Sequence, residues 1–214
     1  MRKKIILGIV ILIVLAAVGG AVYFNINYAI VCSAFYEDDH KYFHYFERKD
    51  VTYFWGRYTQ PFENDDIVLS TPSLKRFTKI KRLSLSVDEK TNLKYLSKMN
   101  ELEELELFYF DGCAGQLETR LETLPELLKL KKMTIWAKQA ESLYSILPYR
   151  VFELENENYN FSNIETLSLE TFEVVDFDSI KHFKNLKNLY VLEDSLTNKE
   201  IEELQSRGIN VEIV

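Results

Sequence analysis

The chain has 214 residues, 47% of them hydrophobic, which is long enough for an N-terminal membrane segment followed by one folded domain. Its formal net charge is −7, and without the basic residues at positions 2–4 there are 23 basic residues against 33 acidic ones. This acidic balance argues against nucleic acid or an anionic lipid surface as the main partner, because both require a basic stripe.

The N-terminal 24 residues are predicted to form a transmembrane anchor. Three basic residues at positions 2–4 precede an uncharged apolar run over residues 5–24, about the length that crosses a bilayer as a helix. Because basic flanks stay in the cytoplasm, we expect a single-pass protein with its N-terminus inside and its C-terminal domain periplasmic or extracellular. The alternative is a cleaved signal peptide, since Ala17, Gly19 and Ala21 suit a processing site.

Residues 25–64 are predicted to form a membrane-proximal, aromatic-rich N-terminal cap. The aromatic residues concentrated here are Tyr42, Phe43, Tyr45, Phe46, Tyr53, Phe54, Trp55, Tyr58 and Phe62. A cap that closes the end of the following repeats explains them, and a sugar-stacking platform or a membrane-interface belt would also use such residues. His40 and His44 have a spacing that suits metal ligation, but two histidines beside a generic acidic run define no complete coordination set, so we predict no metal.

From residue 65 to residue 214, apolar residues recur in copies with a spacing of three residues that ends in a spacing of two. The two most regular copies are Leu93, Leu96, Met99, Leu102, Leu105, Leu107 and Leu121, Leu124, Leu127, Leu130, Met133, Ile135. This rhythm indicates a turn or short helix leading into a strand. The equivalent strand positions are Leu83, Leu105, Met133, Leu167, Leu189 and Val211, with steps of 22, 28, 34, 22 and 22 residues. No single copy buries its apolar face alone, so the copies are expected to stack.

The end of the chain has its own pattern. Ile201 and Leu204 have helical spacing, Gly208 suits a helix stop, and the alternation that follows through Ile213 predicts a final strand.

The pattern Leu-x-x-Leu-x-Leu, at Leu102, Leu105, Leu107 and in the form Leu186, Leu189, Val191, resembles the leucine-rich repeat family, and the 22-residue step is similar to its bacterial, internalin-like class. The resemblance implies an α/β solenoid with a parallel sheet on the concave face, helices or turns on the convex face, and protein or glycan binding by the concave side chains. The asparagine that normally follows the strand in the family is replaced here by Asp88, Phe110, Lys138, Phe172 and Asp194.

Charged residues lie between the buried strand residues and are expected to point to the concave face. Their sign alternates from strand to strand, for example from Arg82 to Glu104 and Glu106 and then to Lys132. Neighbouring strands of a parallel sheet would therefore pair opposite charges, each exposed pair contributing less than about 1 kcal/mol. The same residues are candidates for a recognition surface.

Three aromatic residues border this charged face: Phe108, Trp136 and Tyr190. Large aromatics exposed beside charges are the usual anchors of an interface, so we predict a partner-binding centre here, with Glu104, Glu106 and Lys132 beside it. The alternative is that the rings pack under the loop at residues 111–115.

No arrangement of nucleophile and base is recognisable and there is no glycine-rich loop, so we predict no catalytic residue and no cofactor. The resulting hypothesis is a membrane-anchored protein-binding protein of the envelope, an immunity-type inhibitor being one such role. The alternatives are an envelope hydrolase that uses the carboxylates Glu153, Glu155 and Glu157, and a structural component of an envelope assembly. Cys32 and Cys113 are either free thiols or one disulfide.

Overall fold

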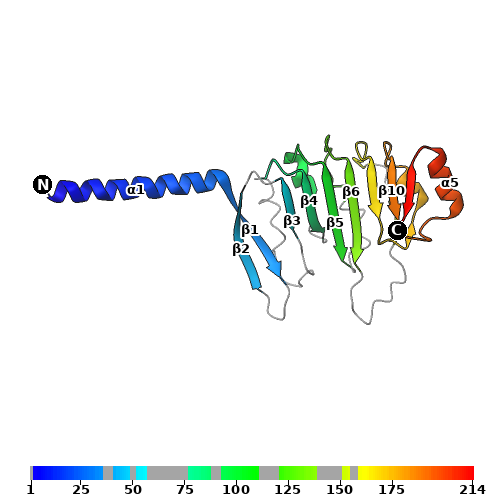
Figure 1. Cartoon of the computed structure of the whole chain (residues 1–214), viewed down its shortest axis with the longest axis horizontal. Coiled ribbons are helices and arrows are strands. Elements are labelled where there is room, and N and C mark those ends of the chain that lie inside the picture. Colours follow the sequence, from blue (N-terminus) through cyan, green and yellow to red (C-terminus); the bar gives the residue numbers. More distant parts are fainter. Residues whose placement is uncertain are drawn as a thin grey trace.

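The computed structural model describes residues 2–35, 41–48, 52–56, 77–87, 93–110, 121–138, 151–154 and 159–214. These residues form an α/β structure in which a mostly parallel sheet is preceded by one long N-terminal helix (Figure 1).

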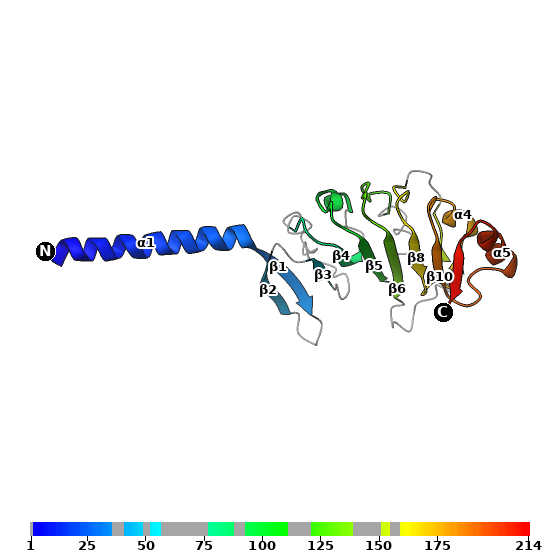
Figure 2. The same cartoon turned by 45° about the horizontal axis from the view of Figure 1, so that its top comes forward.

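The N-terminal helix α1 (Arg2–Asn27) extends away from the sheet, as Figures 1 and 2 show from two sides. Its segment Ile9–Asn27 is long and apolar enough to span a membrane. At 1.5 Å per residue those 19 residues cover about 28 Å, close to the thickness of a hydrocarbon core. Leu12 is 71% exposed, so the apolar side chains of this segment are not covered by the rest of the chain. The helix ends three residues beyond the predicted limit at residue 24.

Two strands, β1 (Tyr28–Phe35) and β2 (Lys41–Arg48), follow α1 and pair antiparallel, from Tyr28 opposite Arg48 to Phe35 opposite Lys41. This pair occupies part of the predicted cap at residues 25–64. The ring of Tyr28 stacks on that of Phe24, with centroids 4.9 Å apart. The side chains of the predicted cap aromatics from Tyr42 to Phe62, of His40 and His44 and of Cys32 lie outside the described part of the structure.

Within the described ranges the main sheet has seven strands in the order β11-β10-β8-β6-β5-β4-β3, and every neighbouring pair is parallel. The strands are β3 (Tyr53–Gly56), β4 (Arg82–Val87), β5 (Glu104–Phe110), β6 (Lys132–Lys138), β8 (Thr166–Leu169), β10 (Asn188–Val191) and β11 (Asn210–Ile213). Their spatial order follows their order in the chain, so each connection leads to the adjacent strand. Because β3 precedes residue 65, the sheet begins within the region predicted as the cap.

The register of this sheet confirms the predicted equivalence of six apolar residues. Leu83 lies opposite Leu105, which lies opposite Met133, and the line continues through Leu167 and Leu189 to Val211. Five of the six are at most 2% exposed, and Val211 at the edge is half-buried.

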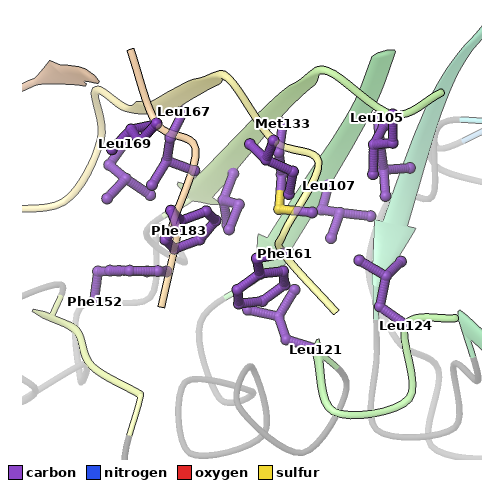
Figure 3. Packing of buried hydrophobic residues seen from close by; sticks show 14 of the residues in the cluster. Leu105, Leu107, Leu121, Leu124, Met133, Phe152, Phe161, Leu167, Leu169 and Phe183 are labelled. Carbon is purple, nitrogen blue, oxygen red and sulfur yellow. The ribbon is translucent and has the colours of Figure 1, made fainter. Parts of the chain in front are cut away.

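Tight turns before the strands explain the spacing of three. The amide of Met99 donates to the carbonyl of Leu96 (2.8 Å) and the amide of Leu102 to that of Met99 (3.1 Å), following the 3-10 helix η1 (Leu93–Lys98). Before β6 the amide of Leu130 donates to the carbonyl of Leu127 in the same way (3.1 Å). Such bonds close three-residue turns, so every third side chain points to the same side. That side is the core (Figure 3).

Aromatic residues fill the core towards the C-terminal half. The rings of Phe161 and Phe183 stack with centroids 4.4 Å apart, and Phe152 meets Phe172 edge to face at 5.5 Å. Phe152 belongs to β7 (Val151–Phe152), which pairs parallel with β9 (Val174–Val175). Phe172, at one of the positions where the predicted resemblance would place an asparagine, is 2% exposed. At this position the chain therefore uses apolar packing.

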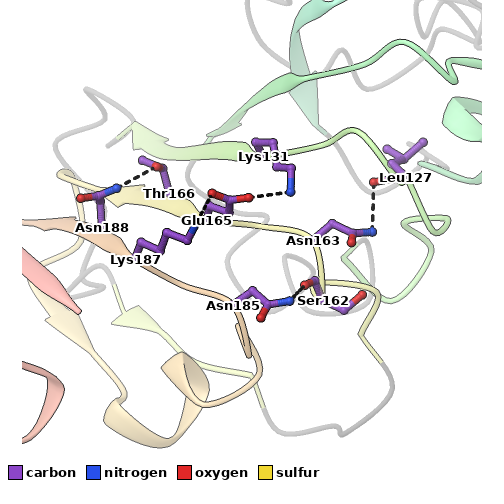
Figure 4. Close-up of polar contacts among 9 residues, drawn as sticks. All are labelled: Leu127, Lys131, Ser162, Asn163, Glu165, Thr166, Asn185, Lys187 and Asn188. Carbon is purple, nitrogen blue, oxygen red and sulfur yellow. Dashed lines mark hydrogen bonds and ion pairs between the residues drawn. The ribbon is translucent and has the colours of Figure 1, made fainter. Parts of the chain in front are cut away.

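Asparagines in the turns before β8 and β10 provide hydrogen bonds between neighbouring turns. The side-chain amide of Asn160 donates to the carbonyl of Leu124 (2.8 Å), and that of Asn185 to the carbonyl of Ser162 (2.5 Å; Figure 4). These bonds satisfy turn carbonyls that the strands do not reach.

The C-terminal segment folds as predicted. The short helix α4 (Phe177–Ile180) precedes β10, and helix α5 (Asn198–Ser206) follows that strand. Helix α5 begins with a capping box between Thr197 and Glu200. Gly208 has a φ of 83°, the left-handed conformation that favours glycine after a helix, and β11 follows.

Candidate binding face of the parallel sheet

The side of the main sheet that faces away from the core is called here the open face. Strand alternation places Arg82 and Ser84 on it, because Leu83 and Leu85 point into the core. The open-face residues of the four central strands are Arg82, Ser84, Glu104, Glu106, Phe108, Lys132, Thr134, Trp136, Thr166 and Ser168. All six predicted site residues therefore lie on one face, since Tyr190 follows Asn188 in the same alternation on β10.

The backbone holds the start of each strand in a repeated arrangement. The carbonyl of Lys81 accepts hydrogen bonds from the amides of both Glu103 and Glu104, at 2.8 and 2.9 Å. The carbonyl of Glu103 accepts in the same way from the amides of Lys131 and Lys132. Consecutive strands are thus tied at the residue before each strand, which brings the charged residues of neighbouring strands side by side.

These charged residues form ion pairs between neighbouring strands, as the alternation of sign predicts. The Lys81 ammonium lies 2.9 Å from the Glu103 carboxylate. The Glu165 carboxylate lies between Lys131 at 2.5 Å and Lys187 at 2.6 Å (Figure 4). Hydrogen bonds from these two ammonium groups lower the pKa of Glu165 to about 2.

Of the two cross-strand pairs that the alternation of sign offers Glu104, the one with Arg82 forms in the described part of the structure. The Glu104 carboxylate lies 3.1 Å from Nε of Arg82, on the neighbouring strand β4. Lys132 is in register with Glu104 on the other side, but within the described residues no ion pair joins them. Arg82 presents a guanidinium fork, which suits a carboxylate better than the single ammonium of Lys132.

Phe108 and Trp136 are brought together by the register of β5 and β6. They are direct partners across these strands, and their rings are nearly parallel, with an interplanar angle of 7° and centroids 6.2 Å apart. The Trp136 Nε1 hydrogen is donated to Glu106 Oε1 at 2.8 Å. Both residues are half-buried. The indole is therefore held by a hydrogen bond and by a ring contact in the free protein.

Tyr190 lies on the open face but apart from this stacked pair. Tyr190 is in register with Ser168 on β8, which in turn is in register with Thr134 on β6. One strand therefore separates Tyr190 from β6, and Trp136 lies two residues beyond Thr134 on that strand. The structure thus unites two of the three predicted aromatics, and the third lies about 10 Å further along the sheet at the usual strand spacing.

A hollow of about 660 Å³ opens on the face beside the stacked pair. Ser84 and Thr134 form part of its lining, together with Glu106 and the pair Arg82 and Glu104. Ser84 is 1% exposed, and its Oγ has no hydrogen-bond partner among the described residues, whereas the buried Ser168 on the same face donates to Glu170 at 2.8 Å. Sequence reasoning did not single out Ser84, because a serine between two strand leucines looks like an ordinary outward residue.

Several other sequence-based hypotheses concern residues outside the described part. These are the loop at residues 111–115, Cys113, and Glu155 and Glu157 of the alternative hydrolase site. Glu153 is exposed on the surface. Within the described ranges no group of three His, Cys, Asp or Glu residues is placed to hold a metal ion.

No protein-family profile matches this chain, and a search of curated proteins finds no significant match.

Proposed function

We propose that this chain is a membrane-tethered binding protein, built as a leucine-rich-repeat-like solenoid, that recognises another protein through the open face of its parallel sheet. The observation that carries the proposal is the stacked pair of Phe108 and Trp136. Two large aromatic rings lie only partly buried on a sheet face that also carries exposed charges. Exposed aromatics of this kind are enriched at the centres of protein interfaces.

The surroundings of the pair support a recognition role. The hydrogen bond from Trp136 to Glu106 orients the indole before any partner arrives, so less side-chain freedom is lost on binding. The ion pairs at the strand starts place charges of both signs at one end of the face that carries the aromatic pair. Such charges favour selection of a partner with a complementary charge pattern.

The apolar segment of α1 supports tethering, because its exposed side chains need a hydrocarbon environment. The basic residues at positions 2–4 favour an orientation with the N-terminus in the cytoplasm and the sheet on the other side of the membrane. The partner is then a periplasmic or extracellular protein, or the external part of another membrane protein.

The test replaces Trp136 by a photo-crosslinking aromatic residue in the full chain, in the cells that produce it, and identifies the linked protein by mass spectrometry. The affinity of that purified protein is then measured for the wild type and for Trp136→Ala. Removal of a central aromatic anchor costs about 2 kcal/mol or more of binding free energy, so we expect the affinity of Trp136→Ala for the partner to fall at least about thirtyfold.

Leu128→Ala is the matched control, because Leu128 is an apolar side chain that is 73% exposed in the turn before β6 and lies off the open face. It should leave the affinity unchanged. A Trp136→Ala protein with an intact circular dichroism spectrum and undiminished affinity would overturn the proposal.

A further inference from the structure

The hollow beside Trp136 contains a half-buried carboxylate that has no cation. Glu106 accepts the Trp136 Nε1 hydrogen at Oε1, and within the described residues its Oε2 has no hydrogen bond and no ion pair. The other acids of the hollow are neutralised, because Glu103 pairs with Lys81 and Glu104 with Arg82. Glu106 is therefore the acid of this hollow whose charge has no basic partner.

A second, independent feature lies next to Glu106. Ser84 is its direct register partner on β4, and both residues line the hollow. Ser84 is 1% exposed, and its Oγ has no hydrogen-bond partner among the described residues. A buried hydroxyl without a partner is unfavourable, and few such groups occur in folded proteins. A free hydroxyl beside a free carboxylate oxygen forms a pair of acceptors for one donor-rich group.

We propose that this hollow receives a basic side chain of the protein partner, with arginine as the best fit. The inference rests on the proposed function and adds the chemistry of the group that the open face recognises. A guanidinium carries several N–H donors in one plane, so it can donate to Oε2 of Glu106 and, after a small side-chain movement that uncovers this buried atom, to Oγ of Ser84 as well. Its flat surface also stacks on aromatic rings, and the Trp136 indole lies directly beside Glu106.

Lys132 also lines the hollow, but it does not take the place of the proposed basic side chain of the partner. It is in register with Glu104, one residue pair along the strand from Glu106, and its side chain is exposed to solvent. A solvated ammonium at that position is screened and does not satisfy the buried hydroxyl of Ser84. The Lys132 ammonium does allow a competing outcome in which an acidic group binds, so the experiment includes a glutamate peptide.

The experiment uses the full chain in detergent micelles and follows the indole N–H resonance of Trp136 by NMR, assigned with Trp136→Phe. The probes are four capped tripeptides with arginine, lysine, citrulline or glutamate between two glycines, together with free L-arginine. We expect a saturable shift with the arginine peptide, weaker binding of the lysine peptide, and no saturable shift with the citrulline or glutamate peptides.

Two variants test the residues that carry the proposal. Glu106→Gln removes the charge at nearly constant shape. It should lower the affinity for the arginine peptide by about tenfold, the usual effect of losing one hydrogen bond to a charged group. Ser84→Ala should lower the affinity for the arginine peptide severalfold. The resistance of the free protein to urea should be unchanged or raised. Glu212→Gln is the matched control, because Glu212 is an exposed carboxylate in the same register row on β11, and it should bind the peptide as the wild type does.

Each contrary result has a defined meaning. An arginine peptide that gives no saturable shift, or that binds Glu106→Gln as tightly as the wild type, overturns the inference. Tighter binding of the glutamate peptide also overturns it and assigns the recognition to Arg82 and Lys132. If free L-arginine binds more tightly than the peptide, the ligand is a small molecule and not a protein side chain. None of these results removes the proposed function, which fails only if Trp136→Ala keeps full affinity for the crosslinked partner.

Discussion

The Trp136 indole donates its N–H to the Glu106 carboxylate across two neighbouring strands, at 2.8 Å. The two residues are diagonal neighbours on the open face, because Glu106 is in register with Thr134 and Phe108 with Trp136. An aromatic residue held by such a bond is oriented in the free protein. The stacked aromatic pair on the open face is thus also part of the folded structure.

The first prediction concerns this bond. Trp136→Phe keeps a large ring on Phe108 but removes the donor, so it should lower the free energy of unfolding by about 1 kcal/mol. Glu106→Gln should have a smaller effect in the Trp136→Phe background than in the wild type, because the two residues share one interaction. Urea unfolding of the four proteins measures the coupling. Equal effects in both backgrounds would show that the bond does not form in solution.

The second prediction concerns the core. Leu105 is 1% exposed and lies between Leu83 and Met133 in the central line of apolar residues. Leu105→Ala should lower the free energy of unfolding by about 2 to 5 kcal/mol, through lost burial and a residual cavity. Leu128→Ala, at a side chain that is 73% exposed, should change it by less than about 0.5 kcal/mol. Similar unfolding midpoints for both variants would contradict the register.

The third prediction concerns pH. The pKa of Glu165 is lowered from 4.5 to about 2 by its hydrogen bonds to Lys131 and Lys187. Because the pKa is depressed in the folded state, the stabilisation is fully present above pH 4.5 and is lost as the pH falls towards 2. The difference in stability between wild type and Glu165→Gln should therefore shrink over that interval.

Urea unfolding at several pH values between neutral and acid measures this difference. Glu212→Gln, at an exposed carboxylate on the edge strand, is the control and should show a much weaker dependence. Added salt should also reduce the Glu165 effect, since both lysines are more than half exposed. A difference that stays constant down to acid pH would show that the two lysines do not hold the carboxylate.

The fourth prediction distinguishes the two possible partners of Glu104. The single changes Arg82→Glu and Glu104→Arg should each destabilise the protein modestly, and their combination should restore part of the loss. Because both side chains are exposed, the recovery should be below about 1 kcal/mol. The combination of Glu104→Lys with Lys132→Glu should recover less, since Arg82 holds the carboxylate in the structure. Greater recovery by the second pair would reverse this assignment.

The fifth prediction concerns α1. If the helix is a retained anchor, the intact mass of the protein from the membrane fraction should include the N-terminal basic residues, and alkaline carbonate should not extract it. Leu12→Arg places a charge inside the apolar segment, at a cost of about 2.5 to 3.5 kcal/mol, and should increase the extracted fraction, whereas Leu12→Val should not. A soluble mature chain that begins near Gly20 or Ala21 would instead identify a signal peptide.

Local patterns in the sequence were sufficient for the parallel sheet and for much of its core. The spacing of three, which ends in a spacing of two at Leu105 and Leu107, matches a turn closed by i to i+3 hydrogen bonds that leads into a strand. Gly208 marked the end of α5 for an equally local reason, since its left-handed φ disfavours residues with a side chain. Tyr53 to Gly56, in contrast, was not recognised as a strand of the main sheet, because four residues carry too short a pattern.

The sequence by itself determined which side of each strand is apolar and which strand positions are equivalent, because the alternation and spacing of side chains depend on neighbouring residues alone. Only the tertiary structure decided which charges meet. Arg82, and not Lys132, reached Glu104, and Glu165 was placed between two lysines from different strands. Only the structure left the Ser84 hydroxyl unpaired beside Glu106. These contacts depend on side-chain length and rotamer across strands that are more than 20 residues apart in the chain, where no local pattern selects among several possible partners.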